Sequence, residues 1–324
     1  MSRVHDALRK AASENRVPAV ESAPSRPKYP VDLESAPVAV ASEPSPDDVS
    51  IPTRFVAAPA ELEGLEDVIR QANSFPYTPA PDALLVHPAK PKDAPAEEFR
   101  SLRTRLNHLQ TTQPLHTLVV TSASPGEGKS FTACNLAMSQ AQLAAKRVLL
   151  ADFDFRRPSI DKIFGLRGKP GLTDYLRGKA GVHDIVNQLE DSNLYVITAG
   201  ESVPNPLELL NLKECGALLE ALRDHFDWVI IDSPPLLFAA DGNLLSTLAD
   251  GTVLVVRIGT TTYDSVSRAL QSLSDNNVLG IVVNGANRGE LYSRYSYYQN
   301  YYYESENRIE TGKQDNLGLE SLDN

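Results

Sequence analysis

Residues 123–130 form a loop whose residue types suit phosphate binding: Ala-Ser-Pro-Gly-Glu-Gly-Lys-Ser. The loop follows an apolar stretch and precedes a helical one, which is the setting that a P-loop needs. Gly126 and Gly128 allow backbone N–H groups to converge on phosphate oxygens, and the start of the following helix adds a partial positive charge. Lys129 can reach the β- and γ-phosphates, and the Ser130 hydroxyl can ligate Mg²⁺. The loop therefore predicts a nucleoside triphosphate site, with ATP and Mg²⁺ as the expected ligands.

Three aspartates follow apolar stretches and could act on the bound triphosphate. Residues 228–232, Trp-Val-Ile-Ile-Asp, have the form of a Walker B element, in which Asp232 contacts Mg²⁺ directly or through water. Asp152 and Asp154 come just after another apolar stretch, and side-chain alternation predicts both carboxylates on the same side. One of them can accept a proton from an attacking hydroxyl while the other holds the metal. Asp232 could also be an ordinary aspartate at the end of a strand. The Asp152/Asp154 pair gains weight only in combination with the loop and the Walker B element.

Two sets of residues are assigned to this predicted site. The first set binds the nucleotide and lies in the loop and at the end of the last predicted strand: Ser124, Pro125, Gly126, Glu127, Gly128, Lys129, Ser130, Phe131 and Asn284. The second set is catalytic: Lys129, Asp152, Asp154 and Asp232. The metal is expected on Ser130, Asp154 and Asp232.

A tyrosine-rich segment, residues 292–303, follows the last predicted strand and holds seven of the 12 tyrosines. Four interpretations compete: an aggregation-prone edge strand, a stacking surface for nucleic acid, a chance low-complexity run, or a set of phosphate acceptors. The formal charge of −11 argues against nucleic acid as a partner. The predicted phosphate acceptors are Tyr292, Tyr295, Tyr297, Tyr298, Tyr301, Tyr302 and Tyr303.

Apolar strands alternate with helical stretches from residue 95 onwards. The predicted strands are rich in Val, Ile and Leu with little alternation, as expected when both faces are covered: Thr117–Thr121, Arg147–Ala151, Leu194–Thr198, Trp228–Ile231, Thr252–Ile258 and Leu279–Val283. Helices between such strands suit crossovers in a mainly parallel sheet. The sequence therefore predicts one doubly wound α/β P-loop NTPase domain over residues 95–290.

The segments outside this domain have a different composition. Residues 1–16 predict a short amphipathic helix. Residues 17–94 are rich in Pro and Ala and predict a disordered linker, with a brief helix near Leu62–Ile69. Residues 291–324 combine the tyrosine-rich segment with an acidic, disordered end.

The chain also lacks signals for other compartments and cofactors. No apolar run reaches the ~18–20 residues that span a bilayer, and the N-terminus does not resemble a signal peptide. A cytoplasmic location is therefore expected, with membrane association only through a partner. Cys134 and Cys215 give neither a disulfide framework nor metal-ligand spacing, so they are expected to pack in helices.

These residues resemble the bacterial tyrosine autokinases (BY-kinases) of exopolysaccharide and capsule synthesis. The resemblance covers about residues 94–303 and rests on the motifs above and on four more: Arg156–Pro158, Phe164–Leu166, Gly171–Asp174 and Pro204–Leu210. It implies an ATP-dependent kinase that phosphorylates its own C-terminal tyrosines in trans. It also implies Asp152 as the base and Asp154 on the metal, although an exchange of these two roles stays open.

A further motif of this resemblance is Glu97-x-x-Arg100-x-x-Arg103. In the family this spacing carries ring formation between subunits, and on a helix it places three charges along one side. A solvated helix face is the alternative interpretation. The resemblance also implies a soluble kinase beside the inner membrane, activated by a separate transmembrane polysaccharide co-polymerase and opposed by a cognate tyrosine phosphatase.

The MinD/ParA partitioning ATPases share the fold and the order of motifs, and they provide the competing prediction. In that case the chain would be a non-kinase P-loop ATPase that recruits or positions a partner. Those proteins carry a signature lysine early in the P-loop, where this chain has Ser124. This difference and the tyrosine-rich segment both favour the kinase.

Overall fold

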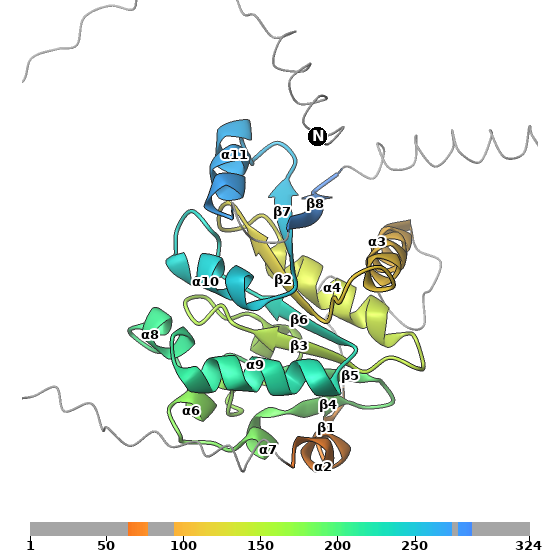
Figure 1. Ribbon diagram of the computed structural model, residues 1–324, viewed down its shortest axis with the longest axis vertical. Helices are drawn as coiled ribbons and strands as arrows, with labels where there is room; N and C mark the ends of the chain where they lie inside the picture. The colour runs from red at the N-terminus through yellow and green to blue at the C-terminus, as the bar shows by residue number, and fades with distance from the viewer. Residues whose placement is uncertain (1–63, 77–93, 274–277, 287–324) are drawn as a thin grey trace, which may run out of the picture. The chain divides into compact units, whose positions relative to one another are not determined.

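The computed structural model describes residues 64–76, 94–273 and 278–286, and these form a sheet covered by helices (Figure 1). The strands are β1 (Asn73–Phe75), β2 (Thr117–Ser122), β3 (Val148–Asp152), β4 (Asn187–Leu189), β5 (Leu194–Ile197), β6 (Trp228–Asp232), β7 (Gly251–Arg257) and β8 (Val278–Asn284). The helices are α2 (Leu65–Arg70), α3 (Ala94–Gln110), α4 (Lys129–Ala141), α5 (Ile160–Ile163), α6 (Leu172–Leu176), α7 (Val182–Ile185), α8 (Pro206–Leu210), α9 (Lys213–His225), α10 (Ala240–Leu248) and α11 (Tyr263–Ser272).

The strands lie in the order β1-β4-β5-β3-β6-β2-β7-β8. All neighbouring pairs are parallel except β4 with β5. The predicted doubly wound, mainly parallel sheet is therefore confirmed, and all six predicted strands are present. The sequence did not predict β1 and β4, each of which has only three residues.

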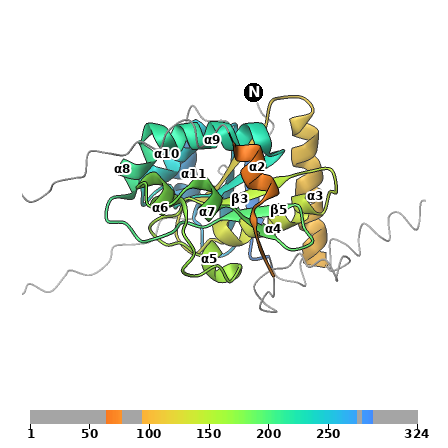
Figure 2. The ribbon, with the colours of Figure 1, turned by 90° about the horizontal axis from the view of Figure 1, so that it is seen from below.

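Successive residues of the central strands face opposite layers, and both layers are apolar. In β2, Leu118 and Val120 pack in one cluster with residues of α3 and α4, whereas Val119 packs in another with residues of α9. Figure 2 shows α9 and α10 on one side of the sheet and α4 on the other. Burial on both faces explains why these strands lack polar alternation.

The predicted linker over residues 17–94 is wrong for its part at residues 65–75. This part contains α2, the brief helix that the sequence indicated, and β1, which pairs with β4. Leu65 and Ile69 are 0% and 1% exposed, so they supply apolar burial that offsets the entropy of ordering this short segment. Glu66 also pairs with Arg147, the residue before β3, through two contacts of 2.8 and 3.1 Å.

Several predictions lie outside the described residues. They concern the helix within residues 1–16, residues 17–63 and 77–93 of the linker, and residues 291–324 with their seven tyrosines. None of the described helices is long and apolar enough to cross a membrane. Cys134 and Cys215 are buried free thiols in α4 and α9, as expected.

Candidate active site

The phosphate loop joins the end of β2 to the start of α4, and two glycines shape it. Gly126 and Gly128 have φ angles of +82° and +96°, in the left-handed region that glycine adopts without strain. A Cβ on Gly128 would overlap the carboxamide of Asn284, so this position also needs a residue without a side chain. The loop geometry that the sequence predicted is therefore present.

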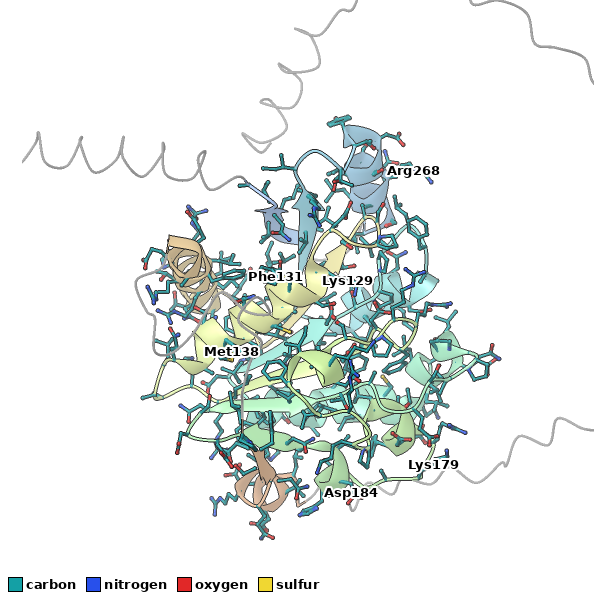
Figure 3. The ribbon with its side chains drawn as sticks, turned by 180° about the vertical axis from the view of Figure 1, so that it is seen from behind. Lys129, Phe131, Met138, Lys179, Asp184 and Arg268 are labelled. Atoms are coloured by element: carbon teal, nitrogen blue, oxygen red, sulfur yellow. The ribbon has the colours of Figure 1, made fainter. Side chains whose placement is uncertain are left out.

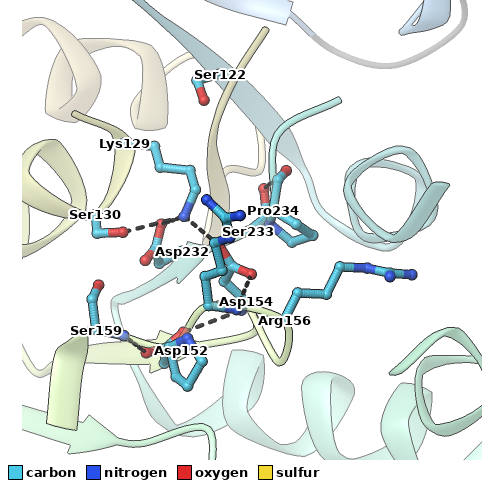
Figure 4. Close-up of polar contacts among 12 residues, drawn as sticks. Ser122, Lys129, Ser130, Asp152, Asp154, Arg156, Ser159, Asp232, Ser233 and Pro234 are labelled. Carbon is cyan, nitrogen blue, oxygen red and sulfur yellow. Dashed lines mark hydrogen bonds and ion pairs between the residues drawn. The ribbon is translucent and has the colours of Figure 1, made fainter. Parts of the chain in front are cut away.

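Lys129 lies at the centre of a buried cluster of charges (Figure 4). Its Nζ lies 2.6 Å from Asp154 Oδ2, 3.4 Å from Asp232 Oδ1 and 3.2 Å from Ser130 Oγ. Burial lowers the pKa of the ammonium group, but Asp232 and Asp154 more than offset this, so the net pKa is raised. The lysine is therefore charged and neutralises two carboxylates when no phosphate is bound.

Asp232 ends β6 and is fully buried beside Lys129. Burial raises its pKa, against the opposing effects of Lys129 and of the hydrogen bond from Ser130. Its Oδ2 has no hydrogen-bond partner among the described residues. A buried carboxylate oxygen without a partner, next to a serine hydroxyl, suits Mg²⁺, which prefers oxygen ligands and completes its shell with phosphates and water.

Asp152 and Asp154 have different hydrogen-bond partners. Asp152 Oδ2 accepts the backbone N–H groups of Ser159 and Ile160, both at 3.1 Å. Its Oδ1 accepts the N–H of Asp154, also at 3.1 Å. Asp154 instead reaches Lys129, as Figure 4 shows. The two carboxylates therefore have different surroundings, because one is held by the start of α5 and the other opens toward the loop.

Burial and the neighbouring Asp232 raise the pKa of Asp152 to about 8, although the N–H groups of Ile160 and Ser159 oppose the rise. Asp152 and Asp232 are register partners on the adjacent strands β3 and β6. Two carboxylates this close and this buried disfavour simultaneous ionisation. This part of the site therefore favours a bound proton or cation.

A cavity of about 460 Å³ opens above the loop and the carboxylates. It is lined by Pro125, Gly126, Gly128, Lys129, Ser130, Phe131, Asp154, Arg156, Arg157, Ser159, Pro234, Pro235, Phe238 and Ala239. Its volume lies in the range of small-molecule sites. Figure 3 shows Lys129 and Phe131 at the same end of α4, with Met138 further along the helix. Six of the nine predicted nucleotide-binding residues therefore line one cavity, together with Asp154.

The other three predicted nucleotide-binding residues support the loop from behind. The Glu127 carboxylate accepts the Ser124 N–H at 3.0 Å and the Thr261 hydroxyl at 2.6 Å, and only 1% of Glu127 is exposed. Asn284 Nδ2 donates to the Glu127 carbonyl at 3.0 Å. Arg257 Nη1 donates to the Gly126 carbonyl at 3.1 Å. Ser124, Glu127 and Asn284 are not among the residues that line the cavity, and these contacts hold the loop in place. Contact of these three residues with a nucleotide stays a prediction.

Sequence reasoning missed the residues on the far side of the cavity. Arg156 makes two contacts with the buried Asp241, of 2.6 and 3.2 Å, and these fix the segment after β3 against α10. Phe238 and Ala239 belong to the turn before α10. In the sequence, Arg156 and Arg157 stand out only as part of the motif Arg156–Pro158, and nothing in the sequence pattern marks Phe238. The shared cavity is what connects these residues to the site.

The three charged residues predicted for ring formation lie on α3. Arg100 pairs with Glu97 at 2.6 Å within the helix. Arg103 Nη1 donates to the Ser139 carbonyl of α4 at 2.7 Å. Burial lowers the pKa of Arg103. Arg103 therefore already has a role within the chain, and the interface between subunits stays a prediction.

Comparisons with known proteins bear directly on this site. The AAA domain family matches residues 116–276, which include the loop and all three aspartates. Tyrosine-protein kinase YwqD of Bacillus subtilis (strain 168) is 37% identical over 211 residues, which cover 64% of this chain and 88% of YwqD. The chain belongs to the bacterial tyrosine-protein kinase family. The resemblance seen in the sequence is therefore confirmed, and the MinD/ParA alternative is not favoured.

Other members of this family match in the same way. Putative tyrosine-protein kinase CapB of Staphylococcus aureus is 31% identical over 217 residues, which cover 66% of this chain and 94% of CapB. Tyrosine-protein kinase Etk of Escherichia coli (strain K12) is 35% identical over 197 residues. The match covers 60% of this chain but only 27% of Etk, so the chain corresponds to one part of that longer kinase.

Solved structures of the family share the fold. The kinase domain of the Escherichia coli tyrosine kinase ETK has a TM-score of 0.59 and 31% identity, and the match covers 72% of this chain and 96% of that domain. The chimerical protein CapA2B2 also has a TM-score of 0.59 and 31% identity, with 67% of this chain and 97% of the chimera covered. The sheet and helices described above therefore have the fold of these kinase domains.

Proposed function

We propose that this protein is an ATP-dependent protein tyrosine kinase that phosphorylates the tyrosines of residues 292–303. The observation that carries the proposal is the buried contact of Lys129, which lines the cavity, with Asp154 and Asp232. In a chain of the tyrosine-kinase family, this arrangement supplies both the cation that holds phosphates and the carboxylates that act on them.

The loop and Lys129 bind and orient the triphosphate. Backbone N–H groups around Gly126 and Gly128 point at phosphate oxygens, and the start of α4 adds its partial charge. When phosphates enter, the Lys129 ammonium exchanges Asp154 for the β- and γ-phosphate oxygens. Asp154 then becomes available to other groups in the cavity.

Ser130 and Asp232 are the residues that we propose to hold Mg²⁺. When bound, Mg²⁺ neutralises charge on the β- and γ-phosphates and orients them for transfer. The buried Asp232 Oδ2 without a partner among the described residues supports this assignment, as does the Ser130 hydroxyl, which contacts the same Lys129 ammonium as Asp232 does.

The geometry favours Asp154 over Asp152 as the catalytic base. The sequence left this choice open, although the family resemblance implied Asp152. Asp154 lines the cavity, whereas both oxygens of Asp152 accept backbone N–H groups. We propose that Asp154 accepts the phenol proton while the phenol oxygen forms its bond to the γ-phosphorus. The bond from the γ-phosphorus to the β–γ bridging oxygen breaks, and ADP leaves. Asp152 positions Asp154 and the start of α5.

The wider role that we propose is control of exopolysaccharide or capsule polymerisation or export. Here the chain would work in the cytoplasm beside the inner membrane, in a ring with copies of itself. A transmembrane polysaccharide co-polymerase would activate it, and a cognate tyrosine phosphatase would reverse the modification. The support for this role is the family resemblance of the motifs, together with relatives such as the putative tyrosine-protein kinase in the cps region of Klebsiella pneumoniae, which is 31% identical.

The test is incubation of the purified chain with ATP and Mg²⁺, followed by anti-phosphotyrosine blotting and mass spectrometry. Phosphotyrosine is expected in the intact chain and absent from Lys129→Met, which loses the phosphate-holding ammonium. ATP turnover without any modified tyrosine, even with the activating membrane protein present, would favour the non-kinase ATPase instead.

Transfer between chains can be tested by mixing two variants. One carries Lys129→Met with an intact tail, and the other is an otherwise unaltered chain that lacks residues 292–303. Phosphotyrosine is expected on the tail of the Lys129→Met chain. Failure to label that tail, while the unaltered full chain labels itself, would contradict transfer in trans.

A further inference from the structure

Phe238 is a large aromatic residue that the fold leaves 66% exposed at the wall of the cavity. It lies in the turn between β6 and α10, where its backbone N–H donates to the Pro235 carbonyl at 3.2 Å. Pro234 and Pro235 line the same wall. Phe238 supplies the exposed surface of an apolar shelf, and the two buried prolines restrict the backbone on which the phenylalanine sits.

The apolar shelf lies beside the phosphate-transfer end of the site. The contacts of Lys129 with Asp154 and Asp232 lie where the proposed mechanism holds the terminal phosphate, and Lys129 and Asp154 line the cavity together with Phe238. The opposite flank of the loop is occupied by Asn284, which binds the Glu127 carbonyl. A flat group resting on the shelf would therefore be next to the γ-phosphate.

Two arginines border the same cavity, but only one is engaged. Arg156 is paired with Asp241 through two contacts. Arg157 is exposed, and its guanidinium makes no ion pair with any residue in the described part of the chain. Its backbone N–H donates to Asp154 Oδ1 at 3.0 Å, so its position is tied to the catalytic carboxylate. The cavity thus offers an apolar shelf and a nearby cation.

This combination fits an aromatic ring that is followed by acidic residues. The sequence of this chain contains such a segment at its tyrosine-rich end, where Tyr303 is followed by Glu304, Ser305 and Glu306. Aromatic pairs prefer offset or edge-to-face contacts, and an arginine pairs with a carboxylate in a fork geometry. The shelf and Arg157 would recognise these two features separately.

We propose that Phe238 and Arg157 form the acceptor subsite, in which Phe238 packs against the phenol ring of Tyr303 and Arg157 pairs with a carboxylate that follows it. This inference rests on the proposed tyrosine kinase activity and deepens it, because it names the tyrosine and the residues that select it. The transfer step is unchanged: the Tyr303 oxygen bonds to the γ-phosphorus, Asp154 takes the proton, and ADP leaves.

The experiment uses the full chain and two synthetic peptides of residues 299–308. Both carry Tyr301→Phe and Tyr302→Phe, so that Tyr303 is the single acceptor. The second also carries Glu304→Gln and Glu306→Gln. The kinetic constants kcat and KM are measured for each peptide with the unaltered chain, Phe238→Ala, Phe238→Trp and Arg157→Gln. Binding of a fluorescent ATP analogue and the melting temperature are measured for every variant.

Phe238→Ala is expected to raise KM about three- to tenfold for both peptides, as loss of one aromatic contact implies, with kcat within about twofold. Phe238→Trp is expected to keep KM near that of the unaltered chain. Arg157→Gln is expected to raise KM for the acidic peptide and not for the amide peptide. The Kd of the ATP analogue and the melting temperature should not move. Leu248→Ala, an exposed apolar position at the far end of α10, serves as the matched control.

Two kinds of result would overturn the inference. An unchanged KM in Phe238→Ala, or an equal effect of Arg157→Gln on the two peptides, would exclude the acceptor subsite. A weaker Kd for the ATP analogue would instead place these residues on the nucleotide. If the unaltered chain phosphorylates neither its tail nor a peptide, the kinase proposal itself fails, which is distinct from a kinase whose KM is insensitive to Phe238.

Discussion

Lys129 serves as the internal counter-ion of the active site. The ammonium lies within 2.6 Å of Asp154 and 3.4 Å of Asp232, and both carboxylates are buried. Without a nearby cation, buried carboxylates are costly in free energy. In the proposed mechanism, phosphates therefore enter a site where a cation is already in place, and their arrival releases Asp154.

Substitution of single aspartates distinguishes the catalytic base, whose loss lowers kcat, from a metal ligand, whose loss weakens Mg²⁺ binding. Asp154→Asn is expected to lower kcat about 10²–10⁴-fold with little change in the Mg²⁺ concentration for half-maximal activity, because it removes the base. Asp232→Asn is expected to raise that Mg²⁺ concentration about tenfold or more. Both effects are measured as kcat over a series of Mg²⁺ concentrations. Asp264→Asn serves as the control, because the Asp264 side chain is 78% exposed.

The opposite pattern would contradict this assignment. If Asp154→Asn recovers full kcat at saturating Mg²⁺ while Asp152→Asn does not, Asp152 is the base and Asp154 a metal ligand. That result would restore the assignment that the family resemblance implied.

Asp152 also predicts how folding stability depends on pH. Its pKa is about 8 in the folded, nucleotide-free chain against an ordinary value of 3.8, so the folded chain binds more protons between these values. The free energy of unfolding is therefore expected to fall as the pH rises from about 5 to about 8. Denaturation curves at each pH should show a shallower fall for Asp152→Asn than for Asp264→Asn. Equal slopes would mean that Asp152 is ionised throughout.

At the scale of elements, the sequence predicted the parts of the site that follow long apolar strands. Asp152 and Asp232 end β3 and β6, and the loop follows β2. The apolar pattern of the strands and the motifs therefore both placed the site at the ends of these strands. The short strands β1 and β4 were missed because three residues carry too little periodicity to detect. Their existence depends on pairing with distant strands, which no local pattern records.

The packing of α2 against the domain can be tested by a single truncation. Ile69 is 1% exposed and packs in the same cluster as residues of α7 and α9. Ile69→Ala is therefore expected to lower the free energy of unfolding by about 2–5 kcal/mol. Gln71→Ala changes an exposed neighbouring residue. Its free energy of unfolding should stay within about 0.5 kcal/mol of that of the unaltered chain in the same denaturation assay. Equal stability of both variants would mean that residues 65–75 do not dock in solution.

The charged side of α3 provides a test of assembly. Glu97→Ala combined with Arg100→Ala is expected to shift the mass in light scattering from a ring to a protomer. The matched control combines Glu98→Ala with Arg105→Ala, two exposed charges on the same helix. Because the Arg100 side chain is only 19% exposed, the melting temperature of each double variant is measured as well. A change in mass without a change in melting temperature reports on assembly. The same mass for both double variants would favour a merely solvated helix face.

At the scale of the whole molecule, the order of the strands assembles the site. Because β6 lies between β2 and β3, the carboxyl ends of the three strands bring the loop and the aspartates together. Asn284 reaches the loop from β8, 157 residues away from Glu127. The sequence therefore predicted six residues that line the cavity, but not that Glu127 and Asn284 hold the loop through contacts with its backbone and with Thr261. It also gave no sign of Phe238, because the role of an exposed aromatic depends on which cavity the fold places beside it.

The central claim is that the γ-phosphate of ATP is transferred to a phenol of this chain. The most direct measurement is incubation of the purified chain with Mg²⁺ and ATP carrying ¹⁸O on the γ-phosphate, followed by tandem mass spectrometry of residues 292–303. The account predicts ¹⁸O-labelled phosphate on tyrosines of this segment, with Tyr303 among them. Release of labelled inorganic phosphate with residues 292–303 unmodified would contradict it.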